Sequence, residues 1–179
     1  MEADAVSRKD SLIQALEQSD NWRRQERAER IRWVSQYQVE VNGMISGSVE
    51  LISLLNEARD CFVEAHYIAA LVLATAVIEH LVSEELVTTG KAKYGLPFEK
   101  AIQVAKEQGL FPVEMLAYAD SLRVVRNPFA HRKPDGHPHT LGNRYLSQKR
   151  NPNLVVREDA QTALIAMYGF FRHALKIGD

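Results

Sequence analysis

Cysteine is nearly missing from this sequence of 179 residues, in which Cys61 stands alone. A single cysteine excludes an internal disulfide and any zinc site built on several thiolates, and it suits a reducing compartment. We therefore expect a cytoplasmic protein. An excess of either charge is also missing, because 22 Lys and Arg face 23 Asp and Glu, for a formal net charge of −1. No global field then draws the chain toward nucleic acid or a membrane, so any such affinity must come from charge that gathers locally.

Long hydrophobic runs are missing as well. The most apolar stretch, Tyr67–Ile78, has 12 residues, whereas a helix that spans a bilayer needs about 20. We expect this stretch to belong to a buried helix of a soluble protein that does not contact membranes. Strand-like alternation, internal repeats and a Gly-rich phosphate loop are not found either. The predicted fold class is therefore all-α.

Residues 1–47 differ in character from the rest and are predicted to form an N-terminal helical arm and hinge. The arm begins with a short apolar stripe, which consists of Leu12, Ile13 and Leu16. A charged stretch follows, over Trp22–Arg32. Trp22 and Trp33 lie 11 residues apart, close to three helical turns, so a helix would place both indoles on one face. Two interpretations of that face stay open: it docks on the main domain, or it binds a protein partner.

Residues 48–179 are predicted to form a helical bundle, separated from the arm by a hinge at Val41–Ser48 that contains two glycines. Proline before a helix and glycine after it set most of the expected bounds. The expected helices are one or two from Ser48 onward, a central helix over Tyr67–Leu86, one over Phe98–Gln108, one from Pro112 to the region of Arg126, and a last one over Glu158–Lys176. Lys133–Val156 is rich in Pro, Gly, Asn and His, and is predicted to be a long loop.

Charge of one sign gathers in the second half of the chain. The segment Arg123–Arg157 contains eight basic residues and one acidic residue, Asp135, which gives it a net charge of +7 and leaves −8 on the rest. Positive potential in an otherwise acidic protein suits a phosphate ligand.

The segment Arg126–His131 reads Arg-Asn-Pro-Phe-Ala-His and lies within this basic region. On a straight helix Arg126 and His131 would point about 140° apart. Pro128 lacks an N–H and clashes with the preceding turn, so we expect it either to kink the helix or to start a new one with Asn127 as its cap. Either event turns both side chains into one cleft. There a guanidinium holds a phosphate while an imidazole moves a proton, which is most of what RNA cleavage by its own 2′-hydroxyl requires.

A structural explanation of the same segment stays open. Arg126 would then pair with a buried carboxylate at a helix terminus, and His131 would bond a carbonyl. Glu79 is the carboxylate that needs such a partner, because it lies beside the apolar run of the central helix. Either it points to solvent or it pairs with Arg123 or Arg126.

Three segments follow one another along the chain in an order that resembles the HEPN family of helical bundles. They are Asn56–Ala58 with His66–Ala70, then Ala76–Leu81, then Leu122–His131. HEPN domains have a glutamate on a central apolar helix and, after a further helix, an Arg that is followed by a polar residue and, about four to six positions on, by a His. Glu79, Arg126, Asn127 and His131 match these positions, and the resemblance covers roughly residues 48–176.

The resemblance implies a homodimer in which two such motifs meet. Many members of the family are metal-independent endoribonucleases that act as toxins or in phage defence, and others are catalytically silent. Active chemistry would make His131 the general base or acid, Arg126 the group that neutralises the phosphorane, and Asn127 the residue that orients the motif, with Glu79 in support. The residues expected to hold RNA are Arg123, Arg132, Lys133, Lys149 and Arg150.

Two further interpretations concern the same chain. A non-catalytic dimeric scaffold whose arm recruits a protein partner fits the pattern without any cleavage.

His137 and His139 have the spacing of metal ligands, but Asp135 is the only carboxylate near them in the sequence, and a structural site needs four suitable ligands. We therefore expect neither a metal nor another cofactor.

Overall fold

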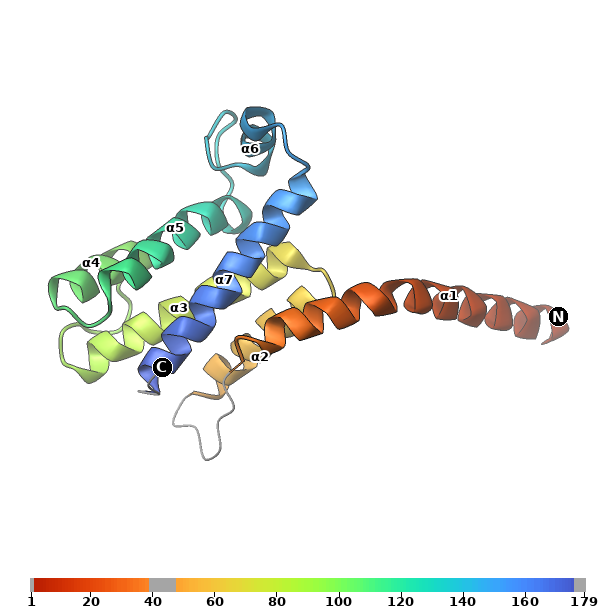
Figure 1. Ribbon diagram of the computed structural model, residues 1–179, viewed down its shortest axis with the longest axis horizontal. Coiled ribbons are helices and arrows are strands. Elements are labelled where there is room, and N and C mark those ends of the chain that lie inside the picture. Colours follow the sequence, from red (N-terminus) through yellow and green to blue (C-terminus); the bar gives the residue numbers. More distant parts are fainter. Residues whose placement is uncertain (1, 39–47, 176–179) are drawn as a thin grey trace. The chain divides into compact units, whose positions relative to one another are not determined.

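The computed structural model describes residues 2–38 and 48–175 of the chain (Figure 1). These residues form seven helices and no strand, which confirms the all-α prediction. Residues 1–36 and 37–179 are two compact units, and each is described by itself. The expected hinge at Val41–Ser48 lies, apart from Ser48, outside the described residues.

The first unit is a single helix, α1 (Glu2–Ser35), of 34 residues. The apolar stripe and the charged stretch of the predicted arm therefore belong to one continuous helix. Because the helix is unbroken between them, Trp22 and Trp33 lie on the same face, as their spacing predicts. Trp22 is exposed.

The second unit is a bundle of six helices with α3 at its centre. Their bounds are α2 (Val49–Val63), α3 (Tyr67–Thr88), α4 (Phe98–Glu107), α5 (Val113–Ala130), α6 (Leu141–Gln148) and α7 (Pro152–Ala174). α3 packs against α2, α4, α5 and α7, whereas α6 packs against α7. α3 and α5 run in opposite directions (Figure 1). The central helix expected from the apolar run is thus confirmed.

Local sequence explains where these helices begin and end. Ser48 caps α2, since its Oγ accepts a hydrogen bond of 3.1 Å from the amide of Leu51. Pro97 and Pro112 directly precede α4 and α5. Gly90 and Gly109 follow α3 and α4 with φ of 68° and 63°, the left-handed conformation in which glycine is preferred at helix ends.

One side of α3 forms much of the core. Its buried residues recur with helical spacing, and they are Ala70, Leu71, Ala74, Thr75, Val77, Ile78, Leu81, Val82 and Leu86. By length and composition α3 is also apolar enough to cross a membrane, and its contacts with four helices account for the same composition. The sequence predicts a buried helix, but the opposite side of α3 is only partly covered. Ile68 and His80 are exposed there, and Val72 and Glu79 are half-buried.

The prediction of a long loop over Lys133–Val156 is wrong. Residues 141–148 form α6, and α7 begins at Pro152, six residues before the expected start. Asn151-Pro152 resembles a turn in the sequence but starts a helix, because the Asn151 side chain caps α7 by accepting from the amide of Asn153 at 2.9 Å, with proline in the first turn. α6 is held against α7 by Arg144, which donates to both carboxylate oxygens of Asp159 at 2.5 and 2.8 Å.

Replacement of a core residue on α7 tests the assignment of its buried side. Leu164→Ala is expected to lower the free energy of unfolding by about 2–5 kcal/mol, because the buried side chain leaves a cavity. Ile165, its neighbour, is 43% exposed, so Ile165→Ala is expected to lower it by less than about 1 kcal/mol. Urea denaturation followed by circular dichroism measures both values. Equal losses would show that α7 buries a different side.

Candidate functional site

Glu79 and Arg126 form an ion pair between the middle of α3 and the C-terminal part of α5. The guanidinium Nη2 donates to the Glu79 Oε2 at 2.9 Å, across 47 residues of sequence. The Arg126 side chain is 14% exposed and that of Glu79 is 34% exposed. The pair confirms the prediction that Glu79 has an arginine partner, and it identifies that partner as Arg126 and not Arg123.

The guanidinium of Arg126 keeps bonding capacity beyond this pair. Its Nε is buried and has no hydrogen-bond partner among the residues that the structure describes. A buried N–H donor that is left unpaired costs free energy, and an added acceptor would recover that cost. Because the Nε has almost no accessible surface, an anionic ligand would have to meet the exposed part of the Arg126 side chain, or the neighbouring side chains would have to move.

The end of α5 contradicts one of the two expected arrangements, the new helix capped by Asn127. The helix continues through Pro128 to Ala130, so Asn127 lies inside it and does not cap a new helix. Pro128 stands in the last turn of α5 and brings no N–H to bond the Val124 carbonyl, so the helix has one hydrogen bond fewer at this turn. The turn closes when the His131 amide donates to the Asn127 carbonyl at 2.8 Å.

His131 itself leaves the helix. It has an extended backbone, with φ −138° and ψ 128°, so the 140° separation of a straight helix does not apply to it. His131 is exposed, and its imidazole bonds no residue in the described part of the chain. Of the four residues that match the HEPN positions, Arg126 bonds Glu79, and Asn127 and His131 lie in the turn that ends α5.

Half of the basic residues in the Arg123–Arg157 segment are neutralised by carboxylates outside it. Besides Arg126 and Arg144, Arg123 bonds Asp120 through Nε at 2.9 Å and lies 3.8 Å from Glu99. Arg150 bonds both carboxylate oxygens of Glu158. Two of the residues expected to hold RNA, Arg123 and Arg150, are thus already paired.

The Arg150–Glu158 pair lies in solvent, between the end of α6 and the first part of α7. Hydrogen bonding to Arg150 lowers the pKa of the Glu158 carboxyl; desolvation, the next largest effect, raises it in part, and the attraction of the guanidinium lowers it further. Because the pKa of Glu158 is lowered in the folded state, its pair with Arg150 stabilises the fold at pH values above the unfolded-state pKa. This stabilisation is lost as the pH falls through the folded-state pKa.

The remaining cations of the segment make no ion pair with any described residue. They are Arg132 and Lys133 in the connection after α5, Lys149 at the end of α6, and Arg157 on α7. Lys133 is half-buried and the other three are exposed. Lys149 ends α6 with φ of 52°, a left-handed conformation that is uncommon outside glycine.

His137 and His139 stabilise the connection between α5 and α6. The amide of His139 donates to the Nδ1 of His137 at 3.3 Å, and the His137 carbonyl accepts from Thr140 and Asn143, each at 2.9 Å. Over residues 2–38 and 48–175, no three His, Cys, Asp or Glu side chains gather as a metal site requires.

Two features of this region have no clear signal in the sequence. The first is the Arg144–Asp159 pair, in which both side chains are nearly buried, at 13% and 14% exposure. The second is an open pocket of about 570 Å³ beside Glu79, between α3 and the segment that precedes α4. His80, Glu84 and Tyr94 also line it. Both depend on tertiary packing, which spacing along the chain does not report.

Comparison with known protein families, with curated proteins and with solved structures finds no match to this chain.

Removal of the Glu79 charge tests the role of the ion pair. Glu79→Gln is expected to lower the free energy of unfolding by about 1–2 kcal/mol, because it leaves the half-buried Arg126 without its anion, and solvent at Glu79 limits the loss. Glu84→Gln, at an exposed glutamate one turn further along α3, is the matched control and should change it by less than about 0.5 kcal/mol. Urea denaturation of both variants, and of each combined with Arg126→Gln, measures the coupling. A coupling energy near zero would contradict the proposed role of the pair.

Proposed function

We propose that the protein is a metal-independent endoribonuclease of the HEPN type that acts as a homodimer. The observation that carries the proposal is the state of Arg126, which is oriented by Glu79 and retains an unsatisfied buried donor, one helical turn before an exposed and unbonded His131. A fixed cation and an imidazole without a partner are two of the groups that cleavage of an RNA phosphodiester uses. The resemblance of the motif to HEPN domains supports the same assignment.

The reaction needs two proton transfers. One imidazole takes the proton of the 2′-hydroxyl as its oxygen attacks phosphorus, and a protonated imidazole gives a proton to the 5′-oxygen as its bond to phosphorus breaks. The products are a 2′,3′-cyclic phosphate and a 5′-hydroxyl. One motif supplies one histidine, so a two-fold dimer that brings two copies of His131 together supplies both the base and the acid. Arg126 stabilises the charge of the phosphorane, and Asn127 orients the turn.

The ion pairs of the structure change which residues are proposed to hold RNA. Arg132, Lys133, Lys149 and Arg157 carry charge that no described carboxylate neutralises, so they are the cations available to the phosphate backbone. Arg123 and Arg150 act by holding α5 and α7 in place. A cytoplasmic role as a toxin or a phage-defence component belongs to the same proposal.

A dimeric scaffold without catalysis is the second candidate. The observation in its favour is α1, which extends over 34 residues and exposes Leu12, Leu16 and Trp22. Such a helix suits recruitment of a protein partner. The two candidates differ in their response to RNA at low salt, which only the ribonuclease binds and cleaves.

Cleavage is expected to proceed in excess EDTA and to depend on His131. The purified full chain should cut RNA but not DNA, which lacks the 2′-hydroxyl, and should leave a 2′,3′-cyclic phosphate. His131→Ala should abolish the reaction, and His137→Ala is the matched control, because His137 lies in the following connection. Gel analysis of end-labelled RNA measures both. Inhibition by EDTA would show that the mechanism is wrong, and a stable dimer that cuts no RNA would favour the scaffold.

RNA binding is expected to weaken with salt, because unpaired cations release counterions from phosphates. Lys149→Gln should reduce the salt slope by about 0.7, the value of one contact to a single strand. Lys106→Gln, at an exposed lysine on α4 outside the basic segment, should leave the slope unchanged. Fluorescence anisotropy with the His131→Ala background measures binding without cleavage. Equal slopes for Lys149→Gln and the parent would place the RNA elsewhere.

A further inference from the structure

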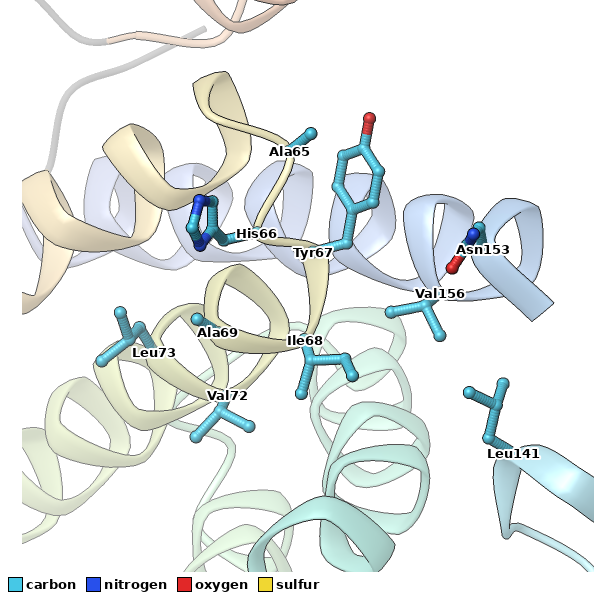
Figure 2. Close-up of a pocket in the computed structure, with 10 residues that line it drawn as sticks. All are labelled: Ala65, His66, Tyr67, Ile68, Ala69, Val72, Leu73, Leu141, Asn153 and Val156. Carbon is cyan, nitrogen blue, oxygen red and sulfur yellow. The ribbon is translucent and has the colours of Figure 1, made fainter. Parts of the chain in front are cut away.

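An apolar groove of about 620 Å³ lies where the start of α3 meets α6 and the start of α7. Ile68 and Val72 of α3, Leu141 of α6 and Val156 of α7 line it, with Asn153 as the polar residue from α7. Figure 2 shows the side chains of Ile68, Val156 and Leu141 around the same space, one from each helix. Such a cavity is large enough for one planar ring system with its sugar.

The groove lies on the same side of the Glu79–Arg126 pair as His131. Because α3 and α5 run in opposite directions (Figure 1), the path from Glu79 toward Val72 and the path from Arg126 toward His131 lead the same way. At the rise of an α-helix, the path from Glu79 to Val72 is about 10 Å along α3, and the path from Arg126 to Ala130, where α5 ends, is about 6 Å. A strand whose phosphate lies at Arg126 and His131 therefore has its neighbouring nucleotide near the groove.

Two groups that can recognise a nucleotide, Tyr145 and Arg157, lie one helical turn beyond residues that line the groove. Tyr145 follows Leu141 by four residues, which places it on the same face of α6, and it is 46% exposed. Arg157 follows Asn153 by four residues on α7 in the same way. The side-chain amide of Asn153, which has both a donor and an acceptor, bonds no described residue.

Each of these groups has a chemical counterpart in a nucleotide. An exposed tyrosine and aliphatic side chains stack on the faces of a base, an amide bonds its edge, and a guanidinium bonds its phosphate. The walls that α6 and α7 contribute to the groove are held together by the Arg144–Asp159 pair. A ligand therefore meets a preformed site.

We propose that this groove is a base-binding subsite, which takes one base of the RNA strand next to the phosphate that is cleaved. The inference rests on the proposed ribonuclease function and extends it to the choice of cleavage site. The base stacks on Tyr145 and the aliphatic side chains, Asn153 selects among bases by its amide, and Arg157 bonds the adjoining phosphate. Tyr67 also lines the groove, and its ring points away from Ile68 (Figure 2).

Binding of RNA that lacks a single base tests the subsite. In the His131→Ala background, Tyr145→Ala is expected to weaken binding of a short RNA about tenfold. Tyr118→Ala, at a 58% exposed tyrosine on α5 outside the groove, is the matched control and should leave it unchanged. An abasic position moved along the RNA should cost the parent the same tenfold at one position only and cost Tyr145→Ala nothing there. Equal costs in both proteins would overturn the inference and leave the ribonuclease proposal standing.

Methyl NMR of the full chain locates the ligand. The four nucleoside 5′-monophosphates are expected to shift the methyl signals of Ile68, Val72 and Leu141, and ribose 5-phosphate is expected to leave them in place. No shift with any nucleotide, or equal shifts with the sugar phosphate, would overturn the subsite. Shifts in a protein that binds no RNA would overturn the RNA assignment and indicate a site for free nucleotides, in which case the ribonuclease proposal fails as well.

Discussion

The ion pair between Glu79 and Arg126 joins the central helix of the bundle to the turn that carries the proposed site. A carboxylate in the middle of an apolar helix needs either water or a cation, and here it has both in part. The same contact orients the Arg126 guanidinium near the end of α5. The stability of the bundle and the geometry of the site therefore depend on one interaction, and changes at either residue affect both.

Several elements of the fold follow from local sequence, and one does not. The central helix is predictable from its apolar spacing and from Gly90 after it, α4 from the proline before it and the glycine after it, and α5 from its apolar spacing and the proline before it. α6 has eight residues, too few for a periodic pattern, and contains Gly142 and Asn143, which are typical of loops. It is stabilised by the contact of Arg144 with Asp159 on α7. Only the tertiary structure shows this contact, so the sequence predicts a loop there.

The candidate site, too, is predictable from the sequence only in part. The Glu79–Arg126 pair is predictable because a charge beside an apolar run requires a partner, whichever residue supplies it. The net charge of +7 overestimates the positive potential of the basic segment, because the count stops at Arg157 and omits Glu158 and Asp159, which immediately follow it and bind Arg150 and Arg144. The groove is unpredictable from spacing, since its three walls come from helices that meet only in the fold.

Pro128 has a consequence for motion as well as for shape. It brings no N–H to the helical ladder, so the last turn of α5 has one hydrogen bond fewer than the turns before it. Local opening of this turn therefore costs less free energy than opening of the buried turns around Leu122. His131 stands at the end of this turn, so its backbone can move while the helix around Leu122 stays packed.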